Sequence, residues 1–461
     1  MNSQSKKMEL LGSASIPKAL LAMGIPTMIG MLVNAFYNLV DAYFVGGLGE
    51  SQMGAISVVY PLGQVVVGLG LLFGNGAASY ISRLLGRGDN ENADKVASTA
   101  LYSSISVGAV IIIISMVFLH PILKLLGATD SILPYAATYA GIYIVSCIFN
   151  VFNVTMNNIV TSEGAAKTTM WALLTGAALN IALDPLFIYV FDLGVAGAAI
   201  ATAISQVVST CVYLTYILRK KSVFHFRVKD CTYSKEIMSE IFKIGIPTLV
   251  FQILTSLSIS LINNAAGNYS DSAIAGMGVV TRLISMGSLS VFGFIKGFQP
   301  IAGYSYGAKK FDRLRESIKT SILWSTVFCV IFGLVLALFS TAIVSQFTKG
   351  DAEMIRIGAT SLKANGITIM LFGFYTVYSS LFLALGKGRE GFILGACRQG
   401  ICFIPVILLL PMVWGLNGIL YAQPIADVLS AIITVFMAIP LHKRLNEMQK
   451  QIATISTNNK N

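Results

Sequence analysis

Long uncharged stretches recur from one end of this sequence to the other. Each has about twenty residues or more, enough at 1.5 Å per residue for a helix to cross a hydrocarbon layer about 30 Å thick. Only 11% of the residues are charged, against about 25% in a typical soluble domain. The sequence therefore predicts an all-α membrane protein. We expect twelve transmembrane helices, near residues 18–41, 53–80, 96–119, 132–157, 168–191, 195–218, 240–265, 273–300, 317–346, 357–385, 391–411 and 416–439.

The basic residues indicate how these helices are oriented. If the N-terminus lies inside, 25 of the 32 Lys and Arg residues fall on the inner side of the membrane and four on the outer side. Such a bias is typical of cytoplasmic loops. We therefore expect a multi-pass plasma-membrane protein with both termini in the cytoplasm. The formal net charge of +11 is then a matter of topology, and a nucleic-acid partner is not expected.

The chain also repeats itself. The tetrapeptide Gly24–Thr27 recurs as Gly245–Thr248, 221 residues later, and Gly86 and Gly197 meet glycines at the same shift. Because each copy holds six helices, both copies enter the membrane from the same side, which predicts two parallel six-helix bundles related by a pseudo-twofold axis. We expect a first lobe at residues 1–218, a cytoplasmic linker at 219–236, a second lobe at 237–440 and a polar tail at 441–461 with only a short helical start.

The sequence lacks motifs for covalent chemistry. It has no phosphate-binding GxxxxGK[ST] loop, no HExxH and no GxSxG, and its six cysteines include no CxxC pair. An enzyme is therefore not expected, nor is a bound cofactor. Uphill transport by such a chain would have to use an ion gradient, in which each charge is worth roughly 2.3 kcal/mol per 100 mV.

Acidic residues at membrane depth are the strongest functional candidates, because a charge there costs several kcal/mol. Asp184 lies late in the fifth expected helix, one turn after Asn180, and Pro185 frees a backbone carbonyl beside it. Thr202 could add a hydroxyl, and Asp41 ends a polar stripe in the first helix. Such hard oxygen ligands suit Na⁺ or a proton. The alternative is a satisfied hydrogen bond between helices.

Other polar and aromatic residues are candidates for lining a substrate cavity. Aromatic faces and methionine thioethers accept planar or cationic molecules, whereas asparagines at helical spacing more often join helices. The candidates are Asn34, Tyr37, Tyr139, Asn153, Asn157 and Met286.

Charged residues in the second half admit two interpretations. Asp427 could form a structural ion pair with Arg282 or Lys296, or these groups could take part in gating. At the repeat shift, Asn180 and Asp184 correspond to Ile401 and Pro405. We therefore expect ion chemistry to be concentrated in the first lobe.

Several stretches resemble the multidrug and toxic compound extrusion (MATE) family, most closely its MepA-like bacterial branch. They are the paired GIPT segments, NAFYNLVDAYFVGGLG, ISRLLGRGDNENADK and LNIALDPLFIYVFDLGVAGAAIATAISQ. The resemblance covers residues 12–440. It implies a V-shaped pair of six-helix lobes that exports cationic or amphiphilic compounds in exchange for H⁺ or Na⁺ by alternating access, in a protein that we expect to be monomeric.

Carried over residue by residue, the family's first-lobe cation network falls on Asp41, Asn180, Asp184 and Thr202. Pro26 takes the place of a proline whose bending accompanies ion binding in some members. The glutamate and aspartate that sodium-coupled bacterial members carry in the seventh and tenth helices are missing from this sequence.

Two other functions were weighed against the antiporter. A flippase for lipid-linked precursors would need a larger and strongly basic cleft, and only Arg282, Lys296 and Arg398 lie within the expected helices. A receptor or scaffold without transport would give the intramembrane acids a cost and no use.

Overall fold

The computed structural model describes residues 3–348 and 350–458. Within this part of the chain, twelve helices are long and apolar enough to cross a membrane, so the predicted all-α membrane fold is confirmed. The first half comprises α1 (Ser3–Gly12), α2 (Ile16–Gly46), α3 (Glu50–Arg87), α4 (Asn90–Val117), α5 (Leu119–Leu125), α6 (Leu133–Ser162), α7 (Ala166–Pro185), a π-helical turn η1 (Leu186–Val190) and α8 (Gly194–Leu218).

The second half follows after a segment that is mostly irregular. Apart from one 3₁₀ turn η2 (Val228–Asp230) in that segment, it comprises α9 (Lys235–Gly267), α10 (Asp271–Gly307), α11 (Phe311–Leu338), α12 (Ser340–Ser345), α13 (Ala352–Thr368), a 3₁₀ turn η3 (Ile369–Leu371), α14 (Phe372–Ala384), α15 (Gly388–Ala396), a π-helical turn η4 (Cys397–Ile401), α16 (Phe403–Trp414), α17 (Leu416–Leu420) and α18 (Ala422–Asn458).

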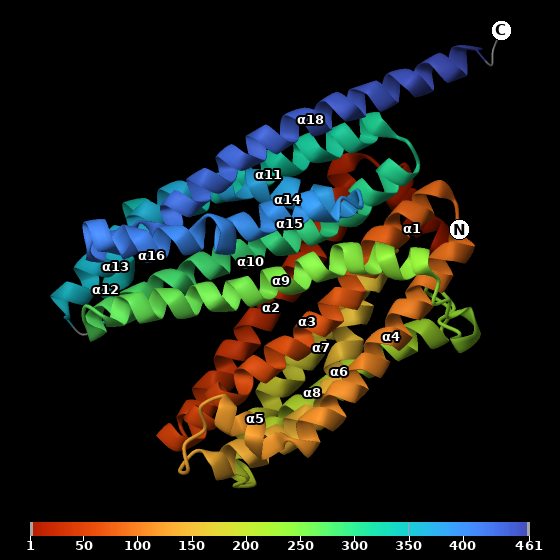
Figure 1. Cartoon of the computed structure of the whole chain (residues 1–461). Coiled ribbons are helices and arrows are strands. Elements are labelled where there is room, and N and C mark those ends of the chain that lie inside the picture. Colours follow the sequence, from red (N-terminus) through yellow and green to blue (C-terminus); the bar gives the residue numbers. More distant parts are fainter. Residues whose placement is uncertain (1–2, 349, 459–461) are drawn as a thin grey trace.

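The helices repeat with the shift seen in the sequence. Helix α4 spans residues 90–117 and α11 spans residues 311–338, so both ends differ by 221. The short helices α5 and α12 also begin 221 residues apart, at Leu119 and Ser340. Figure 1 shows the two sets as two bundles, with α2 to α8 in one and α9 to α18 in the other. We call them the first and the second lobe.

The lobes pack closely where glycines let their backbones approach. A Cβ on Gly297 of α10 would lie 2.4 Å from the backbone nitrogen of Gly24 in α2. A Cβ on Gly245 of α9 would lie 2.1 Å from the carbonyl oxygen of Leu72 in α3. Gly24 and Gly245 are repeat partners, so the two crossings are related by the pseudo-twofold axis. Small residues at such crossings are typical of membrane helix packing.

The lobes meet at one end of the molecule and diverge at the other, which gives a V shape (Figure 1). We call the first the closed end and the second the open end. The closed end holds α1, an ion pair of 2.6 Å between Arg83 of α3 and Glu240 of α9, and the hydrogen bond of 3.0 Å from Tyr80 to Glu236. Because each of these contacts joins the two lobes, separating them at this end would break a set of polar bonds.

Helix α1 was not expected from the sequence, and it contacts both lobes. Lys7 lies 3.2 Å from the buried Glu163 of the first lobe. Lys310 and Arg313 of the second lobe donate hydrogen bonds of 2.8 and 3.1 Å to the carbonyls of Gly12 and Leu11. Burial lowers the pKa of Lys7, and the negative charge of Glu163 acts in the opposite direction.

The expectation of only a short helical start after residue 440 is wrong for the described residues. Helix α18 continues to Asn458, because the polar extension packs against the second lobe. Leu445 is 1% exposed, and His442 and Gln449 form hydrogen bonds of 2.7 Å with Tyr378 and Asp312. Residues 459–461 lie outside the described part.

Candidate functional site

The acidic residues of the first lobe lie where α7 loses its regular form. Helix α7 ends at Pro185 and continues as η1, in which the amide of Phe191 bonds to the carbonyl of Leu186. Asp184 is completely buried and Asn180 is 1% exposed. The Asn180 amide donates to Asp184 Oδ1 at 3.3 Å and to Thr202 Oγ1 of α8 at 3.5 Å. The structure therefore brings together three of the four predicted ion-site residues through direct contacts.

The fourth residue, Asp41 of α2, adjoins this group. Its carboxyl interacts with that of Asp184, and the hydroxyl of Tyr37 faces both acids closely enough to feel their charge. Three buried oxygens of this cluster have no hydrogen-bond partner in the described structure: Asp41 Oδ1, Asn180 Oδ1 and Asp184 Oδ2. The alternative of a fully satisfied bond between helices therefore does not describe this site.

The chemistry of this cluster suits a small hard cation. It offers two carboxyls, one amide oxygen and one hydroxyl, which are ligands for Na⁺, and two adjoining carboxyls can also share a proton. Buried acceptors without partners are costly, so a bound cation or proton would relieve that cost. We call Asp41, Asn180, Asp184 and Thr202 the acid cluster.

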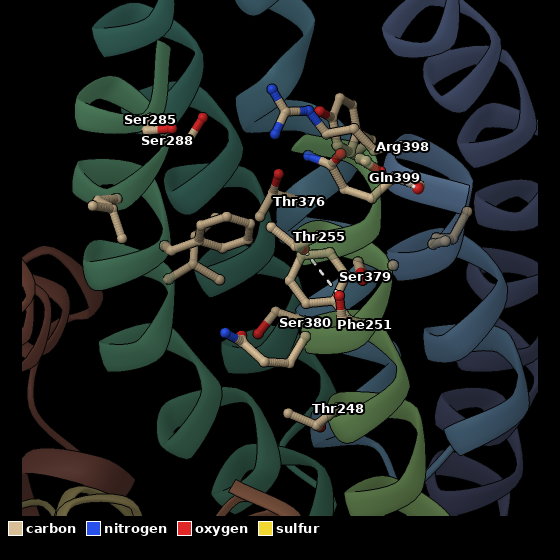
Figure 2. A pocket seen from close by; sticks show the side chains of 18 of the residues that line it. Thr248, Phe251, Thr255, Ser285, Ser288, Thr376, Ser379, Ser380, Arg398 and Gln399 are labelled. Carbon is tan, nitrogen blue, oxygen red and sulfur yellow. Dashed lines mark hydrogen bonds between the residues drawn. The ribbon is translucent and has the colours of Figure 1, made fainter. Parts of the chain in front are cut away.

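A large cavity lies elsewhere, mainly in the second lobe. Its volume is about 570 Å³, and most of its wall comes from α9, α10, α14 and α15. Figure 2 shows part of this wall, with Arg398 and Gln399 toward one end of the view and Thr248 toward the other. The first lobe contributes Met31, Tyr60, Leu71, Asn75 and Asn158. The cavity therefore reaches the boundary between the lobes.

None of the six residues predicted to line a substrate cavity lines this one, so that prediction is wrong for this cavity. Asn153 instead bonds to Gln206 and Thr210 of α8, each at 2.9 Å, which is the helix-joining role. Met286 is 58% exposed on another face of α10, and Asn34 is exposed as well. Tyr37 belongs with the acids, and Tyr139 stacks on Tyr143 with their ring centroids 5.5 Å apart.

The residues that do line the cavity carry a signal that sequence reasoning could have used. Thr248, Gln252, Thr255 and Ile259 of α9 all line it, and their spacing of three and four residues places them on one helix face. This polar stripe follows the second GIPT segment. Its spacing predicts a shared face, but not that the face borders a cavity.

The charged residues of the second lobe pair differently from the expectation. Asp427 bonds to Nε of Arg398 at 3.0 Å, rather than to Arg282 or Lys296. Arg282 is exposed, and the Lys296 ammonium donates to Asn157 Oδ1 across the lobe boundary. The expected structural pair therefore exists, but with another cation, because η4 turns Arg398 toward α18. Spacing within one helix cannot identify a partner on a distant one.

Pro26 lies in the middle of α2, which continues on both sides of it. Its neighbour Thr27 donates a hydrogen bond of 2.6 Å to the carbonyl of Gly293 in α10. Pro247, its repeat partner in α9, lines the cavity. A proline in a helix removes one backbone bond and permits bending, so α2 can bend beside its crossing with α10.

Comparisons with known proteins agree with this architecture. The profile of the MatE family matches residues 26–186 and again residues 247–409, so its two matches begin 221 residues apart. The chain is 32% identical over 429 residues to the multidrug export protein MepA of Staphylococcus aureus strain MSSA476, covering 93% of this chain and 94% of that protein. The corresponding protein of Staphylococcus saprophyticus is 31% identical, with 94% and 95% covered.

Solved structures show the same similarity. One is described as the outward-facing conformation of a multidrug resistance MATE family transporter of the MOP superfamily. It matches with a TM-score of 0.90 and 26% identity, over 96% of this chain and 99% of the other. The whole chain therefore shares the fold of that protein.

Proposed function

Because this chain belongs to the MatE family, we propose that it is a secondary active multidrug efflux antiporter that exports cationic or amphiphilic compounds in exchange for H⁺ or Na⁺. Its twelve long apolar helices make it a multi-pass membrane protein. Its similarity to multidrug export proteins over 93% of its length supports efflux. The coupling ion and the mechanism of exchange are the article's own proposal.

One observation carries the proposal of ion coupling: the three partnerless oxygens of the acid cluster. These atoms come from α2 and α7, and Thr202 adds α8. An ion that binds all three helices would favour the arrangement that brings them together. Since a ligand shifts a conformational equilibrium only through its different affinity for the two states, the ion would thereby bias the lobes toward one opening.

The shape of the molecule fits alternating access. We propose that the closed end, with α1 and the basic linker at 219–236, faces the cytoplasm, as the distribution of Lys and Arg indicates. The open end then faces outward from the plasma membrane. In this state the lobes are joined on the inner side by the Arg83–Glu240 ion pair, which the opposite state would break.

The test measures gradient-driven flux of ethidium in proteoliposomes containing the full chain. Replacing Asp184 by Asn removes one carboxylate while keeping the shape, and we expect it to abolish flux driven by an imposed ion gradient. Asp192→Asn is the matched control, because Asp192 is exposed and its φ of 52° tolerates Asn. Flux driven by pH alone would identify H⁺, and flux driven by Na⁺ alone would identify Na⁺. Undiminished flux in Asp184→Asn would overturn the assignment.

A further inference from the structure

The cavity of the second lobe has a charge opposite to that of the acid cluster. Of the charged residue types, its lining holds Lys296 and Arg398 and no Asp or Glu. Asp427, the partner of Arg398, is 1% exposed and does not line the cavity. A cationic compound would therefore meet positive groups here, whereas an anionic group would meet two cations.

Arg398 has hydrogen-bonding capacity to spare. A guanidinium carries five N–H donors, and in the described structure only Nε has a partner, Asp427 Oδ1 at 3.0 Å. The guanidinium carbon also lies 4.6 Å from the centre of the Phe372 ring. The Asp427 pair and this ring contact hold the group in place. Its two terminal NH₂ groups remain for a ligand, and they form the fork that binds carboxylates in a bidentate way.

Lys296 is a second cation without a countercharge. Its one hydrogen-bond partner among the described residues is the neutral oxygen of Asn157, and it forms no ion pair within them. An ammonium has three donors. Charges at membrane depth face a cavity or a partner and mark substrate pathways. Lys296 can therefore offer its remaining donors to an anionic group in the cavity.

Neutral donors and aromatic rings complete the wall. Three buried polar atoms that line the cavity have no partner in the described structure: Ser288 Oγ, Thr376 Oγ1 and Gln299 Nε2. Ser288 is 6% exposed and Thr376 is 4% exposed, and both belong to the part shown in Figure 2. Phe251, Phe292 and Tyr375 also line it and offer apolar faces. This mixture suits a ligand with an aromatic body and a polar end.

From this geometry we propose that the cavity binds compounds with a carboxylate on an aromatic body, and that Lys296 and Arg398 hold the carboxylate. The inference rests on the proposed export function and narrows its substrate class. The acid cluster binds the small cation, and the second lobe binds the organic anion or the anionic end of a zwitterion. The two lobes thus have opposite preferences, although they arose from one repeat.

The test measures binding to the full chain in phosphatidylcholine nanodiscs, whose lipids carry no net charge. The probes share one environment-sensitive fluorophore: dansylglycine carries a carboxylate, dansylglycinamide is neutral and dansylcadaverine is cationic. Signal from empty nanodiscs is subtracted to remove lipid partitioning. Hydrogen bonds to charged groups predict that wild-type protein binds dansylglycine roughly 10- to 150-fold more tightly than dansylglycinamide.

Variants assign the preference to the two cations. Lys296→Gln keeps a donor for Asn157 but removes the charge, and we expect it to reduce the preference at least about tenfold. Arg282→Gln is the matched control, because Arg282 is an exposed cation on the same helix, and it should keep the preference. The double variant Arg398→Gln/Asp427→Asn removes the second cation without leaving a buried carboxylate unpaired.

The outcomes separate this inference from the proposed function. If wild-type protein binds the amide as tightly as the acid, the inference is wrong without any variant being needed. Equal preference in wild type, Lys296→Gln and the double variant would also overturn it. Because the assay uses no gradient, loss of ethidium flux would count against antiport alone, while a carboxylate preference would stand.

Discussion

The crossing of α2 and α10 allows one substitution to change the balance between the two openings. A Cβ at Gly297 would lie 2.4 Å from Gly24 N and 2.5 Å from the carbonyl carbon of Met23. Contact distances of 3.4 Å and above are ordinary, so Gly297→Ala requires the helices to separate by about 1 Å. Both crowded atoms belong to the backbone, so no side-chain rotation can relieve the overlap.

The cost of this overlap can be expressed as a change of population. Overpacking in a well-packed interior costs about 1–3 kcal/mol, which corresponds to a factor of roughly 5–150 in a two-state equilibrium. We expect Gly297→Ala to disfavour the state in which the closed end is closed. Gly278→Ala is the control on the same helix, because a Cβ there meets nothing within 4 Å.

The assay follows the distance between the lobes at the closed end. Spin labels at Glu91 of α4 and Glu316 of α11, both exposed, are placed in a background without the native cysteines, and their distance distribution is measured by pulsed electron resonance. Gly297→Ala should add or enlarge a long-distance population that Gly278→Ala lacks. Identical distributions in wild type and both variants would refute the argument that this crossing must pack without a side chain.

Three further outcomes follow from particular contacts. Asp427→Asn should lower the free energy of unfolding by about 3–5 kcal/mol, seen in thermal unfolding in detergent, because it leaves the buried Arg398 without its countercharge; an unchanged melting temperature would show that the pair is dispensable. Arg83→Met and Glu240→Gln should show a coupling energy above about 1 kcal/mol in a double-mutant cycle, because their ion pair is largely buried; additive effects would contradict this. Hydrogen bonds from Ser272 and the amide of Met354 lower the pKa of Asp351, which caps α13, below 3.8. The stability that this cap contributes is present above pH 3.8 and is lost as pH falls through the lowered pKa, so the difference in melting temperature between wild type and Asp351→Ala should shrink below that pH.

The sequence by itself determined the architecture. Transmembrane helices announce themselves because unpaired backbone groups cannot be left in lipid, so each crossing needs a continuous apolar run. The GIPT repeat fixed the shift that α4 and α11 later showed in both of their ends. The acids were found because charges at membrane depth are rare and costly. Asp184 also carried its own context, since Asn180 and Pro185 are neighbours in sequence.

Only the tertiary structure decided which polar faces meet and where space remains. Asn153 and Asn157 have the same residue type and helical spacing, yet one joins two helices and the other receives Lys296 from the opposite lobe. Arg398 found Asp427 through a π-helical turn that no apolar pattern indicates. Periodicity records which residues share a helix face. The neighbour of that face is set by the packing of helices that lie hundreds of residues apart, and so the cavity and its positive charge became visible only in three dimensions.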